Sequence, residues 1–175
     1  PTDWHNASFT GQMALISGNV DAAEAEYRRL LAEKERAAVY AGLSGMRDVS
    51  LLEGKFGGII EVWLPSLEEV RQAGEKYIES YVRQRLAAVY LSSGNTAMAL
   101  EQCRKAAAIA RELDDLYLLR GILFVQGLAC LRPGQVREAE AVAAELEAVN
   151  ARGMRKDVDI RICDHLRGRI ELEKK

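Results

Sequence analysis

Glycine recurs at a nearly constant interval in this 175-residue sequence, and this recurrence limits the fold more than any other feature. Gly18, Gly54, Gly94 and Gly134 are separated by 36, 40 and 40 residues, and a leucine stands three residues before each of them. Glycine often ends the first helix of a helical hairpin, because it adopts the left-handed conformation without strain. The interval therefore predicts a stack of helical hairpins.

Small residues recur at fixed distances from these glycines. The position seven residues before the turn, here called the small position, holds Gly11, Ala87 and Gly127 in three units and Arg47 in the other. Five residues after the turn, three of the four units carry alanine. Antiparallel helices need small side chains where their axes cross closely. Apolar residues also recur three and four positions apart, so the sequence indicates an all-α fold.

The pattern predicts nine helices in four pairs and one final helix. Pro65 lies inside the fourth, where it removes a backbone donor and crowds the preceding turn. We expect a kink or break between Trp63 and Ser66, with Ser66 and Glu69 capping a restarted helix. The predicted helices cover roughly residues 4–17, 19–37, 39–53, 55–73, 76–93, 95–113, 115–132, 135–151 and 156–173.

Three segments combine a small residue, a glycine turn, and an alanine followed by one further packing residue: GQMALISGNVDAAEAEY, LAAVYLSSGNTAMALEQC and GLACLRPGQVREAEAVA. On these residues the sequence resembles the tetratricopeptide repeat (TPR) family, in its long-unit bacterial form of about 40 residues. The resemblance implies a right-handed superhelix of antiparallel helix pairs, an α-solenoid, whose concave face binds a protein or peptide.

We expect residues 1–175 to form one repeat domain, excised from a larger protein. Its units cover about 4–38, 39–75, 76–114 and 115–153, followed by a final helix at 156–173. The final helix repeats the first-helix pattern, with Gly168 in the small position, so the parent chain is expected to continue into another unit. Exposed repeat ends would then allow two chains to pair as a homodimer.

Composition excludes several classes of partner and site. The formal net charge is −2 and the isoelectric point is near 5.8, which does not indicate a nucleic-acid surface. No apolar run is long enough for a membrane span, and no signal peptide is present, so we expect a cytoplasmic location. Three cysteines without zinc-ligand spacing predict neither a metal nor a cofactor.

A catalytic constellation is also not expected. Cys163 and His165 are the nearest approach to a nucleophile and its base. Side chains two residues apart on one helix point about 200° away from each other, so this pair cannot transfer a proton within that helix. We therefore expect a protein that is not an enzyme, with an all-α hydrolase as the least favoured class.

The inward face of the first helices is the expected binding surface. Positions six and three residues before the small position and one residue after it should face the concave side, and this face becomes more apolar along the chain. A peptide with apolar and acidic side chains would suit it. The partner-binding candidates are Tyr81, Gln84, Arg85, Phe124, Leu128, His165 and Arg169.

Two interpretations of function remain open. The first is an interaction module that binds a protein or peptide on this face. The second is a regulatory or sensor segment of a larger signalling or transcription-regulating protein, which binds a small ligand or another domain of its own chain. For Arg85 and Phe124 the alternative is purely structural: Arg85 would pair with a nearby carboxylate, and Phe124 would pack between helices.

Overall fold

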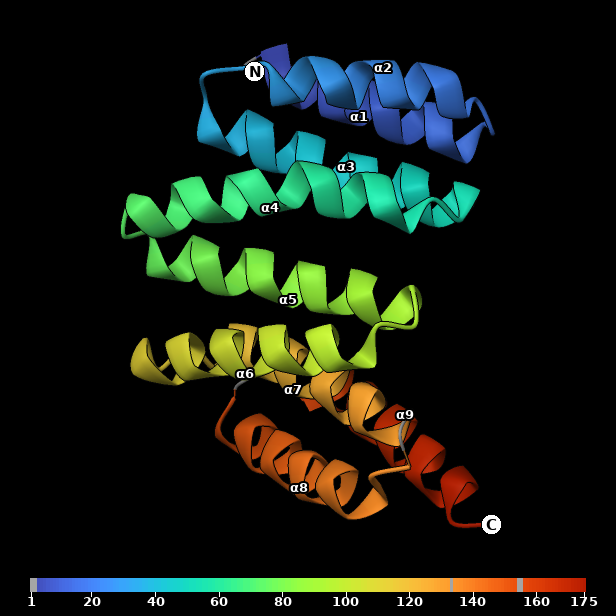
Figure 1. The fold of residues 1–175 in the computed structure, drawn as a ribbon, viewed down its shortest axis with the longest axis vertical. Helices are drawn as coiled ribbons and strands as arrows, with labels where there is room; N and C mark the ends of the chain where they lie inside the picture. Colours follow the sequence, from blue (N-terminus) through green and yellow to red (C-terminus); the bar gives the residue numbers. More distant parts are fainter. Residues whose placement is uncertain (1–2, 133, 154–155) are drawn as a thin grey trace. The chain divides into compact units, whose positions relative to one another are not determined.

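A computed structural model describes residues 3–132, 134–153 and 156–175, and for residues 156–160 it describes the backbone alone (Figure 1). The described residues form nine α-helices and no strand. The helices are α1 (Asp3–Ile16), α2 (Val20–Leu31), α3 (Arg36–Glu53), α4 (Phe56–Gln72), α5 (Lys76–Ser92), α6 (Thr96–Glu112), α7 (Leu116–Leu131), α8 (Val136–Arg152) and α9 (Lys156–Glu173). Odd-numbered helices are called first helices below, and even-numbered ones second helices.

Residue contacts divide the chain into two compact units, 1–65 and 66–175. In the first unit, α2 contacts both α1 and α3. In the second unit, α6 contacts both α5 and α7, and α8 contacts both α7 and α9. Each of these second helices therefore packs between two successive first helices, as the hairpin interval predicts.

The turn glycines adopt the conformation that the spacing predicts. Gly18, Gly54, Gly94 and Gly134 all have φ between 70° and 83°. Asp114 takes the corresponding place before α7 with φ 49°, and it is the one non-glycine residue with positive φ in the described chain. Each turn reverses the chain so that the next helix packs back on the previous one.

Polar side chains start several of the helices that follow the turns. Asn19, Asn95 and Asp115 each accept a hydrogen bond from the backbone N–H three residues later, at the start of α2, α6 and α7. This contact satisfies one of the donors that a helix N-terminus leaves free. Asp114 and Asp115 thus stand between the end of α6 and the start of α7.

The second helix is shorter than predicted. The sequence pattern extends it to residue 37, but α2 ends at Leu31 and α3 already begins at Arg36. Leu30 and Leu31 lie against Gly42 of α3, so the chain must reverse within residues 32–35. The sequence has no glycine or proline at this reversal. The packing of α3 on α2 produces it instead.

The fourth helix is continuous through Pro65, so the predicted break and the restarted helix capped by Ser66 are wrong. Proline removes one helical hydrogen bond, but buried side chains on both sides of it keep the helix in place. Ile59, Trp63 and Leu67 follow each other at helical spacing and are all buried, and the Trp63 indole Nε1 donates to the Leu43 carbonyl at 3.2 Å. The kink stays a prediction.

The cores depend on close contacts at glycines of the first helices. In the first unit, the buried ring of Tyr27 lies between Gly11 of α1 and Gly45 of α3. In the second unit, Leu166 of α9 lies against Gly127 of α7. An alanine methyl at any of these three glycines would come within 2.8 Å of the facing side chain.

Replacing Gly45 tests this packing directly. A methyl group at this position would lie 2.1 Å from Cδ1 of Tyr27, whose ring cannot move away because Gly11 is on its other side. We expect Gly45→Ala to lower the free energy of unfolding by about 1–3 kcal/mol in urea denaturation. The matched control is Gly57→Ala, which faces open space on α4 and should gain up to about 1 kcal/mol of helix stability. Equal stability of the two variants would refute the assigned register.

Candidate functional site: the face of the first helices in the second unit

In the second unit the first helices form one layer and the second helices form the other. Neighbouring helices lie closer together in the layer of first helices. The helix α7 contacts both α5 and α9, whereas α6 and α8 have no close backbone contact in the described chain. When the helices of one layer lie closer together than those of the other layer, the stack curves, and the outer face of the closer layer is concave. All seven partner-binding candidates lie on these three first helices.

Tyr81 and Arg85 lie one turn apart on α5 and contact each other. The guanidinium carbon of Arg85 is 4.8 Å from the centre of the Tyr81 ring, which is a cation–π distance. Arg85 has no carboxylate within ion-pair distance among the described residues, and its buried Nε atom makes no hydrogen bond there. The alternative that Arg85 pairs with a nearby carboxylate is therefore wrong.

Two contacts connect the neighbouring helices on this face. The amide end of Gln84 occupies the space beside Gly121 of α7, where a β-carbon would lie 2.3 Å from Nε2. The rings of Phe124 and His165 meet edge to face, with centres 5.5 Å apart and planes at 78°. Gln84 thus spans α5 and α7, and Phe124 with His165 spans α7 and α9.

The remaining candidates, Leu128 and Arg169, lie one helical turn after Phe124 and His165. Leu128 is partly buried and packs against the core, while Arg169 is exposed. Phe124 also packs against the core, so one part of its side chain has a structural role while another part is exposed. The structure brings together Tyr81 with Arg85 and Phe124 with His165.

The sequence analysis missed three residues beside this group. Tyr77 and Tyr117, at the starts of α5 and α7, are both largely exposed. Partial burial raises the pKa of Tyr77 above its usual value, and the nearby Asp115, Tyr117 and Tyr81 add smaller contributions. The Arg120 guanidinium carbon lies 5.2 Å from the centre of the Tyr117 ring. Tyrosine followed by arginine three or four residues later on a helix is the signal that could have identified both pairs.

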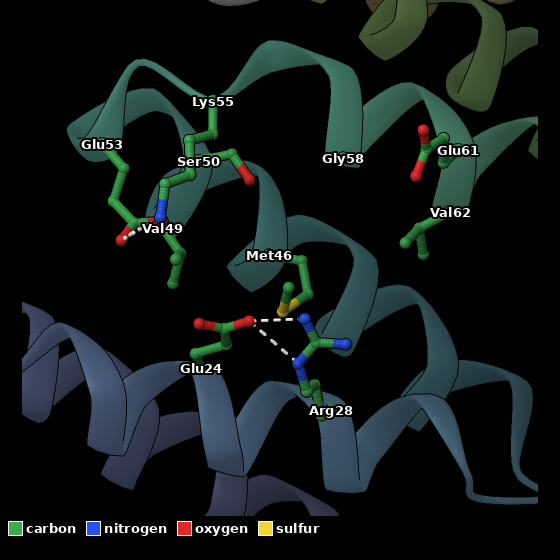
Figure 2. Close-up of a pocket in the computed structure, with 10 residues that line it drawn as sticks. All are labelled: Glu24, Arg28, Met46, Val49, Ser50, Glu53, Lys55, Gly58, Glu61 and Val62. Carbon is green, nitrogen blue, oxygen red and sulfur yellow. Dashed lines mark hydrogen bonds and ion pairs between the residues drawn. The ribbon is translucent and has the colours of Figure 1, made fainter.

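A hollow lies entirely within the first unit, between α2, α3 and the start of α4 (Figure 2). Its volume is about 310 Å³, and Gly58 lines it at the position where the other units carry Ala22, Met98 and Glu138. Its wall includes an ion pair between Arg28 and Glu24 at 2.5 Å. The lining residues are Glu24, Arg28, Met46, Val49, Ser50, Glu53, Lys55, Gly58, Glu61 and Val62.

The cysteines have environments that oppose nucleophilic chemistry. Burial raises the pKa of the Cys103 thiol to about 12, and it also raises the pKa of Cys130 and Cys163. Cys163 Sγ accepts a hydrogen bond from Asn150 Nδ2 at 3.0 Å, whereas His165 contacts Phe124. The two residues that resemble a nucleophile and base therefore contact different neighbours.

Within the described ranges, no three His, Cys, Asp or Glu side chains are grouped so that they could hold a metal ion. The helices were also compared with the length and hydropathy that a bilayer requires. None of the helices, over the residues that the structure describes, is long and apolar enough to cross a membrane.

A buried ionic network holds α5 against α6, on the side of α5 away from Tyr81. Arg83 is 8% exposed and donates to Glu79 at 2.8 Å and to Gln102 of α6 at 2.9 Å. Ser80 donates to the Ala106 carbonyl at 3.0 Å. These contacts fix the rotation of α5 and so present Tyr81 and Arg85 on the opposite face.

Comparison with known proteins agrees with this architecture. No protein-family model matches the sequence, and no curated protein is similar to it. A solved structure from Podospora anserina, described as a putative kinesin light chain with nearly identical TPR-like repeats, is similar over 97% of this chain and 94% of its own. The TM-score is 0.68 and the sequence identity is 14%. The chain has a TPR-like fold.

The predicted fold class is therefore confirmed: an all-α, TPR-like helical-repeat solenoid. TPR-like repeats are typically non-enzymatic scaffolds for protein interaction. The long-unit bacterial subclass and the single domain over residues 1–175 stay predictions, as does the binding role of the seven residues on the first helices.

The network at Arg83 gives a test of how this TPR-like face is positioned. In Glu79→Ala the buried Arg83 guanidinium loses its carboxylate, and we expect the free energy of unfolding to fall by about 3 kcal/mol. The control is Glu101→Ala on α6, which removes the solvent-exposed pair with Lys105 and should leave the urea midpoint nearly unchanged. If Glu79→Ala unfolds at the midpoint of Glu101→Ala, the network does not anchor α5.

Proposed function

We propose that the chain is a non-enzymatic interaction module that binds a peptide or partner protein on the first-helix face of the second unit. The observation that carries this proposal is the Tyr81–Arg85 pair, because Arg85 lies beside an aromatic ring and has no ion-pair partner in the part of the chain that the structure describes. Tyrosine and arginine are the residue types that most often dominate protein interfaces.

The chemistry of the face favours one class of ligand. Arg85, Arg169 and His165 supply positive or ionisable groups, and none of the seven candidates is acidic. Phe124 and Leu128 supply apolar surface that is partly accessible. An extended peptide with acidic and apolar side chains would complement this face, with carboxylates at Arg85 and an apolar side chain over Phe124.

The proposal includes three narrower statements. The subclass is the long-unit bacterial form, the chain has no catalytic activity of its own, and the parent protein acts in the cytoplasm. The high thiol pKa values support the second statement, because a thiol that stays protonated is a poor nucleophile.

The binding test uses immobilised protein and a panel of synthetic peptides in which acidic and apolar positions are varied. We expect wild type to select acidic, apolar peptides, and Tyr81→Ala and Arg85→Glu to weaken their binding at least about tenfold. Arg104→Glu is the matched control, since Arg104 is an exposed cation on the second helix α6. Circular dichroism checks that each variant stays helical.

Equal binding by Arg85→Glu and Arg104→Glu would contradict the assignment of the face. A partner captured from the source cells by wild type and lost by Tyr81→Ala would identify the natural ligand. An enzymatic activity of the wild type that the Tyr81→Ala variant retains would instead contradict the statement that the chain has no catalytic activity.

The hollow in the first unit favours a second candidate, the sensor segment that binds a small ligand. Its lining combines apolar side chains, such as Met46 and Val49, with charged ones, such as Arg28, and this suits a small molecule that has both apolar and charged groups.

Filling the hollow tests this second candidate. A small molecule that raises the melting temperature of wild type should lose its effect in Gly58→Leu, because the new side chain occupies the space. Gly57→Leu is the control, since Gly57 also faces open space but does not line the hollow. A ligand that stabilises both variants equally binds elsewhere.

A further inference from the structure

The hollow in the first unit contains one carboxylate that no described side chain neutralises. Glu24 pairs with Arg28 at 2.5 Å, and Glu53 pairs with Lys55 at 3.1 Å. Glu61 of α4 also lines the hollow, but it makes no ion pair or hydrogen bond with any residue that the structure describes. Three carboxylates and two cations therefore line the hollow, so its formal charge is −1.

A buried hydroxyl group without a hydrogen-bond partner lines the same hollow. Ser50 of α3 is only 6% exposed, and its hydroxyl bonds to none of the described residues. The hydroxyls of Ser17 and Ser93, at the ends of α1 and α5, instead donate to a carbonyl three residues earlier. A buried polar group costs free energy unless a partner satisfies it. Ser50 therefore indicates where a polar group of a ligand would bind.

Apolar side chains line another part of the hollow. Met46 is 6% exposed and Val49 is 1% exposed. Gly58 leaves open space beside them, because a β-carbon there would meet no heavy atom outside its own helix segment within 4 Å. The volume of about 310 Å³ is at the lower end of the range for small-molecule sites. The hollow thus fits a compact ligand that has both apolar and polar parts.

We propose that the hollow binds a small organic amine that carries a second polar group at its other end. The ammonium group pairs with Glu61, and the hydrocarbon part covers Met46 and Val49. A hydroxyl at the other end bonds to Ser50, whose own hydroxyl can both donate and accept. Figure 2 shows Ser50 on α3 well apart from Glu61 on α4, which is why the two polar groups belong at opposite ends of the ligand. This inference rests on the second candidate function, the hollow as a small-ligand site, and adds the chemical class of the ligand.

The charges of the hollow favour a cation over an anion or a neutral molecule. Arg28 and Lys55 already contact carboxylates, so an anionic ligand would have to displace one of them. Glu61 would also repel it. A neutral ligand of the same shape would lack the charge-assisted hydrogen bonds to Glu61. Because Glu61 is exposed and water screens its charge, we expect the amine to bind about three- to tenfold more tightly than a neutral analogue.

Titrations of the ¹⁵N-labelled chain, followed by two-dimensional NMR, test the proposal with four probes of one chain length. The probes are 6-aminohexan-1-ol, hexane-1,6-diol, 6-hydroxyhexanoate and hexylamine. We expect 6-aminohexan-1-ol to bind most tightly and to shift the amide signals of α3 and the start of α4. Glu61→Gln should remove its advantage over the diol, and Ser50→Ala should remove its advantage over hexylamine. Circular dichroism checks that both variants stay helical.

The matched control is Glu69→Gln, because Glu69 is an exposed carboxylate on the same helix that does not line the hollow. This variant should bind all four probes as wild type does. If Glu61→Gln keeps the preference for the amine, or if Glu69→Gln loses it, the proposal is overturned. N-acetyl-lysinamide represents a lysine side chain of a partner protein, and tighter binding of this probe than of 6-aminohexan-1-ol would overturn the assignment to a small ligand.

Failure of the ligand class can be distinguished from failure of the second candidate function. If the diol or the hydroxy acid binds as tightly as the amine and Gly58→Leu abolishes the binding, the hollow is a ligand site but not for a cation. If none of the four probes shifts the amide signals around the hollow, the amine proposal is overturned. A different compound whose stabilising effect is lost in Gly58→Leu would then still support the second candidate function.

Discussion

The contact of Tyr27 with Gly11 and Gly45 is the interaction on which the packing of the first unit depends. Two first helices can approach the same aromatic ring only because neither has a β-carbon at the contact. In the second unit the large and small residues exchange places: Ala143 stands where Tyr27 does in its repeat, and Leu166 of the following helix fills the space over Gly127. In both units a large side chain packs against a glycine, but a different helix supplies it.

This packing decides which side chains remain for binding. Helix α5 is held by Arg83 and Ser80 on the side that faces α6, so Tyr81 and Arg85 are left on the opposite face. Binding residues on a rigid helix lose little conformational entropy when a ligand binds.

Much of the candidate site could be located from the sequence, because side chains on one helix keep a fixed angular spacing. The register placed Tyr81 and Phe124 on the first-helix face, where the structure has them partly exposed. It did not reveal the edge contact of Phe124 with His165, since that depends on how close α7 and α9 lie. The burial of Arg83 was also not predicted, because a charged residue is ordinarily assigned to the surface.

The sequence by itself determined the helices, their pairing and the turns, since glycine at positive φ and small residues at a constant interval act through local conformation and through contacts between neighbouring helices. The tertiary structure decided the end of α2, the continuity of α4 through Pro65 and the hollow beside Gly58. Each of these depends on packing between different helices. Their packing energy outweighs the local preference of any single residue, so a local pattern cannot report it.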